Sequence, residues 1–292
     1  MDQGRLNQES FERLMAGLRP RLHRYCARMI GSAIDGEDVV QEALASAAEA
    51  FPAAGPILRP ESWLFRIAHN AALDALRRRR RQKNIASDAD AADVADPGAE
   101  ADARVAATAS LAAFMRLPAA QRSSAILIDV LGYSLDETAD ILGASLAATK
   151  AALHRARIRL RTLAQAEDIS APLLDARERD RLRAYADRFN AREFDALRDL
   201  LAEDARLDLY NRRRLAGRAE VSRYFSHYSE NPNCRIATAL VEGRPVLIMS
   251  DPTAEAADYL ILIDWAQDRI IRIRDFRFAP YVMENLAIAP FS

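Results

Sequence analysis

The sequence predicts a multidomain fold in which two all-α domains precede an α+β domain. Apolar residues recur at helical spacing through the first half of the chain. An acidic, alanine-rich stretch separates two such helical blocks, and after residues 170–172 short strand-like runs replace the long helical pattern. At 292 residues, half of them hydrophobic, the chain is long enough for two or three domains, each with its own core.

The predicted boundaries follow these changes in composition. The first helical domain is expected at residues 1–83, the second at 104–168 and the α+β domain at 173–292. Residues 84–103 contain six acids but no lysine or arginine, and their apolar surface is too small to form a core. We therefore predict an acidic flexible linker between the two helical domains.

Each predicted domain has its own pattern of elements. Residues 11–83 read as helical with one strong break at 51–60, where prolines and a glycine gather. The α+β domain opens with two helices, the second running through Leu201. Its strands are expected at 207–210, 235–241, 246–249, 257–265 and 269–278, with a further helix at 219–228. This order suits a curved antiparallel sheet wrapped around helices, a cone whose concave face usually holds a pocket.

Bulk composition limits the function classes. The net charge is −1, so any attraction to nucleic acid must come from charges gathered locally. Cys26 and Cys234 lie far apart without metal-ligand spacing, which favours a reducing compartment and predicts neither a disulfide framework nor a metal site. The N-terminus lacks the apolar run of a signal peptide, and no stretch is long enough to span a bilayer. We expect a cytoplasmic protein without cofactor or membrane contact.

Residues 134–163 have the pattern of a helix-turn-helix. A first helix ends at Gly143, and Ser145 can cap a second. In the second helix the inward face is expected to hold Leu146, Leu153, Ala156 and Leu160. The outward, basic face is expected to hold Lys150, His154, Arg157 and Arg161. Such a helix can lie in a major groove, whereas the alternative is an ordinary helical hairpin with a solvated cationic face.

A second basic region consists of five successive arginines, Arg77 to Arg81, which only Asp74 opposes. A block of like charge repels itself, so it indicates either a polyanion partner or a disordered tail. Together with the basic helix described above, it favours DNA. Trp63 and Phe65 could support strand opening, but the preferred interpretation is that they are core residues.

An acidic segment lies earlier in the chain, where Asp38 and Glu42 are one helical turn apart. Like charges at this spacing destabilise an isolated helix by roughly 0.2–0.5 kcal/mol, and a basic protein partner would relieve that repulsion. The alternative is a solvated helix start, because acids favour helix N-termini.

Together these features resemble one family, the extracytoplasmic-function (ECF) RNA polymerase sigma factors, over residues 11–83 and 115–163. The string DGEDVVQEAL at 35–44 looks like the helix of conserved region two that docks on the coiled coil of the largest polymerase subunits. The string WLFRIAHNAALDALR at 63–77 is similar to the segment that recognises and melts the promoter element near minus ten. The loop at 51–60 matches the place where the family captures a flipped base.

The second helical block resembles the domain with which the family reads the promoter element near minus thirty-five. LPAAQR at 117–122 and LHRAR at 153–157 look like the two ends of that domain. The recognition helix departs from the family pattern, which usually offers a Gly-Thr pair and a further basic residue, because this chain has Ala147, Ala148 and Ala152. Fewer side chains are then available to specify bases.

Carried over residue by residue, the resemblance implies three sets of site residues. The polymerase-binding set is Asp35, Glu37, Asp38, Gln41 and Glu42. The minus-ten DNA set is Trp63, Arg66, His69, Asn70, Asp74, Arg77, Arg78, Arg79 and Arg80. The minus-thirty-five DNA set is Ser145, Thr149, Lys150, His154, Arg155 and Arg157. The implied partners are core RNA polymerase, through the largest-subunit coiled coil and the flap, and promoter DNA.

Residues 173–292 resemble SnoaL-like (NTF2-like) domains. In similar sigma factors such an extension takes the place of a separate anti-sigma protein, so the resemblance implies regulation in cis. Its last strand and tail are expected to contact the sigma domains through Asp275, Tyr281, Glu284, Asn285 and Leu286. The alternative is that the aromatic residues of this tail, Phe276 and Phe278 above all, close the core.

Two other functions stay open. Related folds include isomerases and cyclases that use a carboxylate or histidine base in an apolar pocket, so the cone could convert or sense a small ligand. The candidates are Asp208, His227, Asp264 and Asp275, with Tyr210 and Trp265 as pocket lining. Because no two of these candidates have a sequence spacing typical of a catalytic pair, we expect no catalytic residue and no enzymatic activity. A further alternative is a sigma mimic that sequesters an anti-sigma factor.

Overall fold

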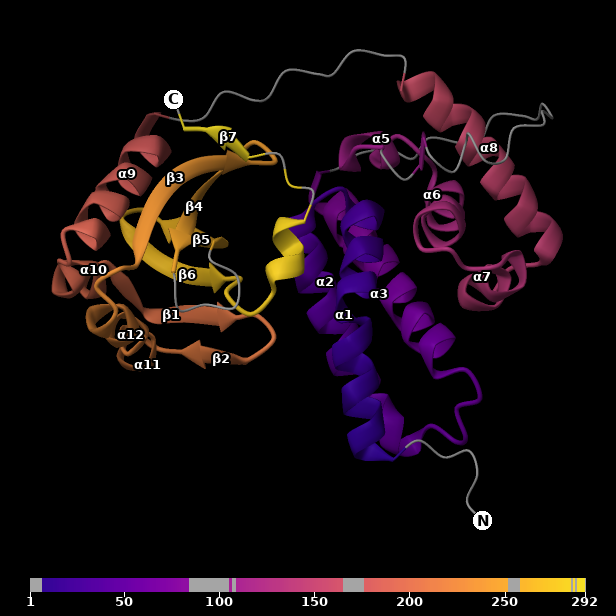
Figure 1. Cartoon of the computed structure of the whole chain (residues 1–292), viewed down its shortest axis with the longest axis horizontal. Coiled ribbons are helices and arrows are strands. Elements are labelled where there is room, and N and C mark those ends of the chain that lie inside the picture. Colours follow the sequence, from indigo (N-terminus) through magenta and orange to yellow (C-terminus); the bar gives the residue numbers. More distant parts are fainter. Residues whose placement is uncertain are drawn as a thin grey trace. The chain divides into compact units, whose positions relative to one another are not determined.

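The computed structural model of the chain describes residues 7–83, 105–106, 109–164, 176–251, 258–284, 286 and 288–291. The chain divides into two compact units, Met1–Asp168 (unit 1) and Ile169–Ser292 (unit 2). Figure 1 shows helices alone in unit 1 and a sheet with helices in unit 2. The predicted acidic linker lies outside the described residues.

Three long helices open unit 1: α1 (Gln8–Ile30), α2 (Ala33–Ala50) and α3 (Pro60–Lys83), with a short 3-10 turn, η1 (Phe51–Ala53), after α2. The predicted break at 51–60 is confirmed, but the structure adds another at Gly31. Gly31 has a φ of +75° and ends α1, a left-handed conformation that costs glycine little. One residue later Ser32 caps α2 by accepting a hydrogen bond from the Asp35 amide.

Helices α1 and α2 approach closely at Gly36, inside the acidic segment. A Cβ atom built there would lie 2.8 Å from the Ala27 backbone, so only glycine fits. The close contact fixes which face of α2 is buried and which carries its acids.

The second helical block of unit 1 contains α5 (Leu111–Met115), α6 (Ala119–Ala125), a π-helical turn η2 (Ile126–Val130), α7 (Leu135–Leu142) and α8 (Leu146–Ala164). It shares one continuous core with the first three helices, in which Phe114 and Ile141 join Tyr25 and Phe65. The two predicted helical domains therefore pack together as one unit.

The helix-turn-helix prediction is confirmed. Ser134 and Glu137 form a capping box at the start of α7, and Gly143, with a φ of +63°, ends that helix. Ser145 then accepts a hydrogen bond from the Ala148 amide at 3.2 Å. The inward placement of Leu146 was wrong: its exposed fraction is 46%, because the buried face of α8 begins at Thr149.

Unit 2 begins with α9 (Ala176–Asn190) and α10 (Phe194–Asp199). A seven-stranded sheet follows in the spatial order β2-β1-β6-β5-β4-β3-β7. The strands are β1 (Leu201–Leu209), β2 (Arg213–Ala216), β3 (Arg235–Val241), β4 (Arg244–Ser250), β5 (Asp258–Ala266), β6 (Arg269–Asp275) and β7 (Ile288–Pro290). Helices α11 (Arg218–Ser222) and α12 (Tyr224–Glu230) separate β2 from β3, and a 3-10 turn, η3 (Pro280–Met283), precedes β7. The curved sheet wraps around the helices, with α9 against β3 and β4 (Figure 1).

The predicted α+β class is confirmed, with corrections of detail. The sheet is not antiparallel throughout, because β1 and β6 pair in parallel. These two strands are joined by a long connection rather than a hairpin, which permits parallel pairing. Strand β1 begins at Leu201, which had been placed in the second helix, and the helix predicted at 219–228 is split into α11 and α12. Strands β2 and β7 were missed, because one begins with arginines and the other is three residues long.

Within the described residues, no helix is both long enough and apolar enough to cross a membrane.

Candidate functional site

The acidic residues of α2 lie beside the arginines of α3. Glu42 accepts a hydrogen bond from Arg78, with 2.7 Å between Oε2 and Nη2, and Asp35 forms an ion pair with Arg79. Asp38 and Gln41 are half-buried on the same helix, whereas Glu42 is exposed. The predicted polymerase-binding and minus-ten sets therefore adjoin each other.

Glu37 does not belong to that surface. Its side chain is fully buried and accepts a hydrogen bond from Arg19 Nε at 3.0 Å. A buried carboxylate needs such a cation, since burial without one is costly. Its assignment as a polymerase contact is corrected: Glu37 ties α2 to α1.

The minus-ten set divides into exposed and buried members. The exposed ones are Arg66, Asn70, Asp74, Arg77, Arg78 and Arg80, and Arg79 is half-buried. Trp63 is half-buried with its ring tilted against Phe11 at 5.9 Å, whereas Phe65 is fully buried. The core interpretation is therefore confirmed for Phe65.

His69 is a buried member of that set and pairs with the Tyr25 hydroxyl at 2.7 Å. Burial lowers the pKa of His69 to about 4, so the ring is neutral at neutral pH. A neutral, buried imidazole cannot attract phosphate, which corrects the assignment of His69 to DNA.

A pocket of about 380 Å³ opens beside the loop that follows η1. It is lined by residues 54–59 together with Trp63, Arg66 and Asp140. Arg59 forms an ion pair with Asp140, and Arg66 donates to the Asp140 carbonyl. The loop for which base capture was predicted thus borders a cavity and is held to α7.

The minus-thirty-five set is less exposed than periodicity suggested. Ser145 and Lys150 are exposed, while His154 and Arg155 are half-buried. Thr149 is buried and its hydroxyl donates to the Ser145 carbonyl at 3.0 Å. The accessible members therefore lie toward the N-terminus of α8.

Arg157 is held by Asp129, which comes from the turn η2. Its Nε donates to Oδ2 at 3.0 Å and its Nη2 to Oδ1 at 2.6 Å, and the Asp129 side chain is 1% exposed. This bidentate salt bridge uses two of the guanidinium nitrogens of Arg157. Thr149 is therefore corrected from a DNA contact to a structural group, whereas the partly exposed Arg157 stays a predicted DNA contact whose guanidinium group is already bound to Asp129.

The tail residues predicted for interdomain contact also differ in their exposure to solvent. Tyr281 and Leu286 are half-buried and Glu284 is exposed, while Asn285 lies outside the described residues. Asp275 is fully buried within unit 2, so its side chain cannot form an interdomain contact, and that assignment is corrected.

The core alternative is confirmed for one of the two tail phenylalanines. Phe276 is fully buried and stacks on Tyr210 with 4.3 Å between ring centres. Phe278 is half-buried and lines a pocket instead.

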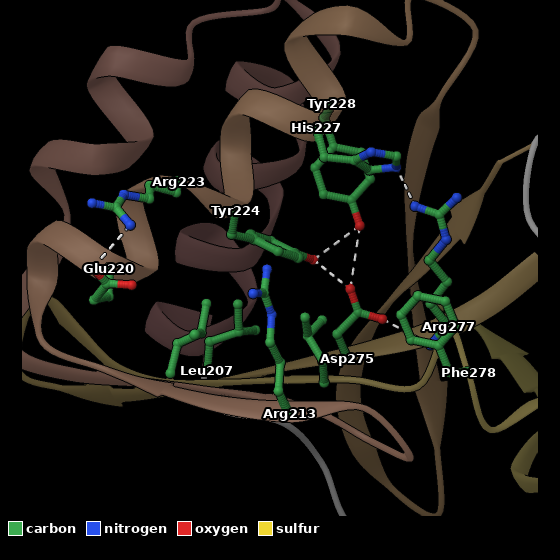
Figure 2. A pocket seen from close by; sticks show the side chains of 12 residues that line it. Leu207, Arg213, Glu220, Arg223, Tyr224, His227, Tyr228, Asp275, Arg277 and Phe278 are labelled. Atoms are coloured by element: carbon green, nitrogen blue, oxygen red, sulfur yellow. Dashed lines mark hydrogen bonds and ion pairs between the residues drawn. The ribbon is translucent and has the colours of Figure 1, made fainter.

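That pocket, of about 400 Å³, lies in unit 2 between β1, β2, α12 and the end of β6. In Figure 2 the hydroxyls of Tyr224 and Tyr228 point at Asp275. They donate to its Oδ2 at 2.7 and 3.2 Å, and the Arg277 amide donates to Oδ1 at 2.8 Å. Tyr259 extends this cluster behind Tyr228, with 3.0 Å between their hydroxyls.

Burial decides the protonation of the groups in this pocket. It raises the pKa of Asp275 to about 6, although the amide of Arg277 and the two tyrosine hydroxyls act in the opposite direction. Burial also lowers the pKa of His227, helped by the adjacent Arg277. Arg277 itself pairs with the buried Asp251 at 3.0 Å.

The structure brings together only part of the predicted pocket set. His227 and Asp275 line the pocket, but Asp208 and Asp264 do not, since they form ion pairs with Arg272 and Arg274. The predicted lining residues Tyr210 and Trp265 are not part of it either. Sequence reasoning missed three groups: Arg213, Tyr224 and Tyr228. The one available signal was the four-residue spacing of the tyrosines in a predicted helix.

No group of metal-ligating side chains occurs among the residues that the structure describes, and both cysteines are buried free thiols.

Three family models match this chain. Sigma-70 region 2 matches residues 14–82, Sigma-70 region 4 matches residues 111–160, and the SnoaL-like domain matches residues 182–274. The first two cover the helices of unit 1 and the third covers most of the curved sheet of unit 2.

The chain is also similar to curated sigma factors. The ECF RNA polymerase sigma factor SigM of Mycobacterium tuberculosis is 33% identical over 154 residues, which are 53% of this chain and 76% of SigM. The RNA polymerase sigma factor CarQ of Myxococcus xanthus is 32% identical over 156 residues, 53% of this chain and 90% of CarQ. Among solved structures, the ECF sigma factor SigJ of Mycobacterium tuberculosis covers 90% of this chain and 95% of SigJ, at 22% identity and a TM-score of 0.36. The chain therefore belongs to the ECF RNA polymerase sigma factors, and it carries a C-terminal SnoaL-like domain.

Proposed function

We propose that the protein binds core RNA polymerase, directs promoter-specific transcription initiation, and is regulated in cis by unit 2. The observation that carries this proposal is the grouping of exposed charge on α2, α3 and the start of α8, within the two segments that the sigma-70 models match. Acids lie on α2 and bases on α3 and α8, so one unit offers surfaces for a basic protein and for DNA.

The polymerase surface of α2 is proposed to consist of Asp35, Asp38, Gln41 and Glu42. Two of these acids already pair with α3 arginines. Partly exposed ion pairs contribute little, commonly up to about 1 kcal/mol, so a basic polymerase surface can replace Arg78 as the partner of Glu42 at small cost.

Promoter contacts near minus ten are proposed for the exposed face of α3. Arg77 and Arg80 would supply phosphate contacts, while Arg66 and Trp63 border the pocket beside the loop. A cavity with an aromatic wall and a cation suits an unstacked base.

Contacts near minus thirty-five are proposed for the first turns of α8. Ser145 and Lys150 are exposed there together with Leu146, Ala147 and Ala148. Apolar side chains can contact the methyl group of thymine but donate no hydrogen bonds to base edges. This part of the interface should therefore be tolerant of sequence.

The family is one of transcription factors rather than enzymes, and we propose that unit 2 acts without turnover. The sigma-mimic alternative does not account for the exposed arginines of α3 and the exposed Lys150 of α8, which a mimic would not need.

The experiment that tests polymerase binding reverses charge on α2. The double variant Asp38→Lys, Glu42→Lys should bind core polymerase at least tenfold more weakly than the unaltered chain, as measured by fluorescence anisotropy. Glu49→Lys changes another exposed acid at the end of the same helix and should leave the affinity unchanged. Equal core affinity for all three proteins would remove α2 from the polymerase interface.

A further inference from the structure

We infer that the pocket of unit 2 binds a small, largely apolar carboxylate that carries a hydroxyl group at its far end. The pocket holds about 400 Å³, the size of a site for a small organic molecule. Its walls divide into an apolar middle, a buried polar end and a cationic side, and each part specifies one portion of the ligand.

The apolar middle comes from β1 and β2. Strand register sets Leu207 opposite Leu215 and Leu209 opposite Arg213. Residues directly opposite on antiparallel strands share one face, so three leucines and Arg213 face the pocket together. The leucines would contact the body of a flat or ring-shaped apolar molecule.

The buried polar end offers acceptors for hydrogen bonds. The Tyr224 proton is used in the bond to Asp275, and the Tyr228 proton is shared among Asp275 and neighbouring tyrosines. Each phenol has one proton but two lone pairs, and an ionised carboxylate only accepts. A ligand group that meets Tyr224 and Asp275 must therefore bring its own proton, as a hydroxyl does.

An ammonium group would also bring protons, but the charge of the lining opposes it. Arg223 pairs with Glu220 and Arg277 with the buried Asp251, so Arg213 is the lining cation without an ion pair to any described residue. Like charge raises the cost of placing a second cation there. A neutral hydroxyl is therefore favoured at the buried end.

The cationic side of the pocket suits an anionic group of the ligand, because Arg213 has no acidic partner among the described residues. Arg223 pairs with Glu220 at 3.0 Å, and Arg277 pairs with Asp251. Arg213 has no ion pair or side-chain hydrogen bond to any described residue, and it points from β2 into the pocket (Figure 2). A guanidinium group matches a carboxylate with two parallel hydrogen bonds.

The test titrates the full chain with 6-hydroxy-2-naphthoate, whose fluorescence reports binding. The expected result is saturable 1:1 binding with a Kd below about 1 mM. Two analogues remove one group each: 2-naphthoate lacks the hydroxyl and 2-naphthol lacks the carboxylate. Each should bind at least tenfold more weakly than the hydroxy acid.

Matched variants locate the site. Arg213→Ala should weaken binding of the hydroxy acid at least tenfold while leaving the affinity for 2-naphthol unchanged. Tyr224→Phe should reduce the preference for the hydroxy acid over 2-naphthoate. Arg206→Ala removes an exposed arginine of β1 that lies outside the pocket and should change nothing.

The inference is overturned if binding does not saturate, if either analogue binds as well as the hydroxy acid, or if Arg213→Ala and Arg206→Ala behave alike. No polymerase is present in this titration. Failure of transcription with intact binding would count against the proposed function alone, and the reverse result would count against this inference alone.

Discussion

Helices α3 and α8 are both basic, but they use their arginines differently. On α3, Arg77 and Arg80 are exposed, and the Arg77 side chain is 67% exposed although it pairs with Asp74, which is itself 56% exposed. On α8, Arg157 is 18% exposed and bound to the buried Asp129. The difference teaches that a basic face is a DNA surface only where the charges are not already used to hold the fold, so α3 should supply most of the phosphate affinity.

The largest expected effect comes from Arg157→Ala. It would leave Asp129 buried without its cation, which should lower the free energy of unfolding of unit 1 by about 2–4 kcal/mol. Urea unfolding followed by circular dichroism measures this. Arg159→Ala, on an exposed position of the same helix, should stay within about 0.5 kcal/mol of the unaltered chain. If the Arg157→Ala protein were as stable as the unaltered chain but bound DNA more weakly, Arg157 would be a DNA contact, and the contrast between α8 and α3 would be wrong.

Protonation of His69 should have the next largest effect. Its pKa falls from 6.5 in the unfolded chain to about 4 in the fold, so the unfolded state binds more protons between these values. The contribution of His69 to the free energy of unfolding is fully present above pH 6.5 and is lost as pH falls toward 4. The loss from this residue is on the order of 3 kcal/mol. His23, whose pKa burial also lowers to about 4, adds a similar loss.

The measurement is urea unfolding at several pH values. His69→Gln should reduce the pH slope of stability, and His23→Gln serves as the comparison for a second buried histidine. An unchanged slope in the His69→Gln protein would show that His69 is accessible, which would return it to the candidate DNA contacts.

The double variant Arg77→Ala, Arg80→Ala tests the exposed face of α3. Each phosphate interaction that is removed should lower the salt dependence of promoter binding by about one unit of slope, so the double variant should lose about two units, and its affinity should fall for all sequences alike. Holoenzyme binding to labelled DNA at several salt concentrations measures the slope. The control is Arg13→Ala on α1, whose side chain is equally exposed. If Lys150→Ala on α8 lowered the slope more than the double variant, the ranking of the two helices would be wrong.

The smallest effect is expected from Asp140→Ala. This change would free Arg59 from its ion pair, in which both side chains are more than half exposed. Such pairs contribute up to about 1 kcal/mol, so promoter affinity should rise by no more than about fivefold. Asp136→Ala, on an exposed position of α7, should have no effect. A fall in affinity with Asp140→Ala would indicate that Asp140 supports the base-capture loop in its binding form.

Features carried by neighbouring residues could be predicted from the sequence. The helix-turn-helix follows from Gly143 and Ser145, and the α3 cation cluster follows from an uninterrupted run of arginines. Both depend on local backbone preferences and on helical periodicity, which a single segment contains in full.

Partnerships between distant segments could not be predicted. Periodicity placed Arg157 on the outer face of α8, but it does not reveal that η2 brings Asp129 against that face. Asp275 at the end of β6 accepts hydrogen bonds from two tyrosines of α12 about fifty residues earlier in the chain, a pairing that depends on the tertiary fold. Burial and pKa depend on such contacts, so Glu37 and His69 were misassigned to surfaces, and Asp275 was misassigned to the interdomain tail although its alternative place in the pocket is confirmed.

The most direct test of the central claim is run-off transcription with purified core polymerase, comparing the full chain with a version that ends at Asp168. The account predicts core-dependent transcripts from defined start sites with the full chain and a changed yield when unit 2 is removed. Absence of transcripts from both proteins, despite circular dichroism showing that they are folded, would contradict the assignment of initiation to this chain.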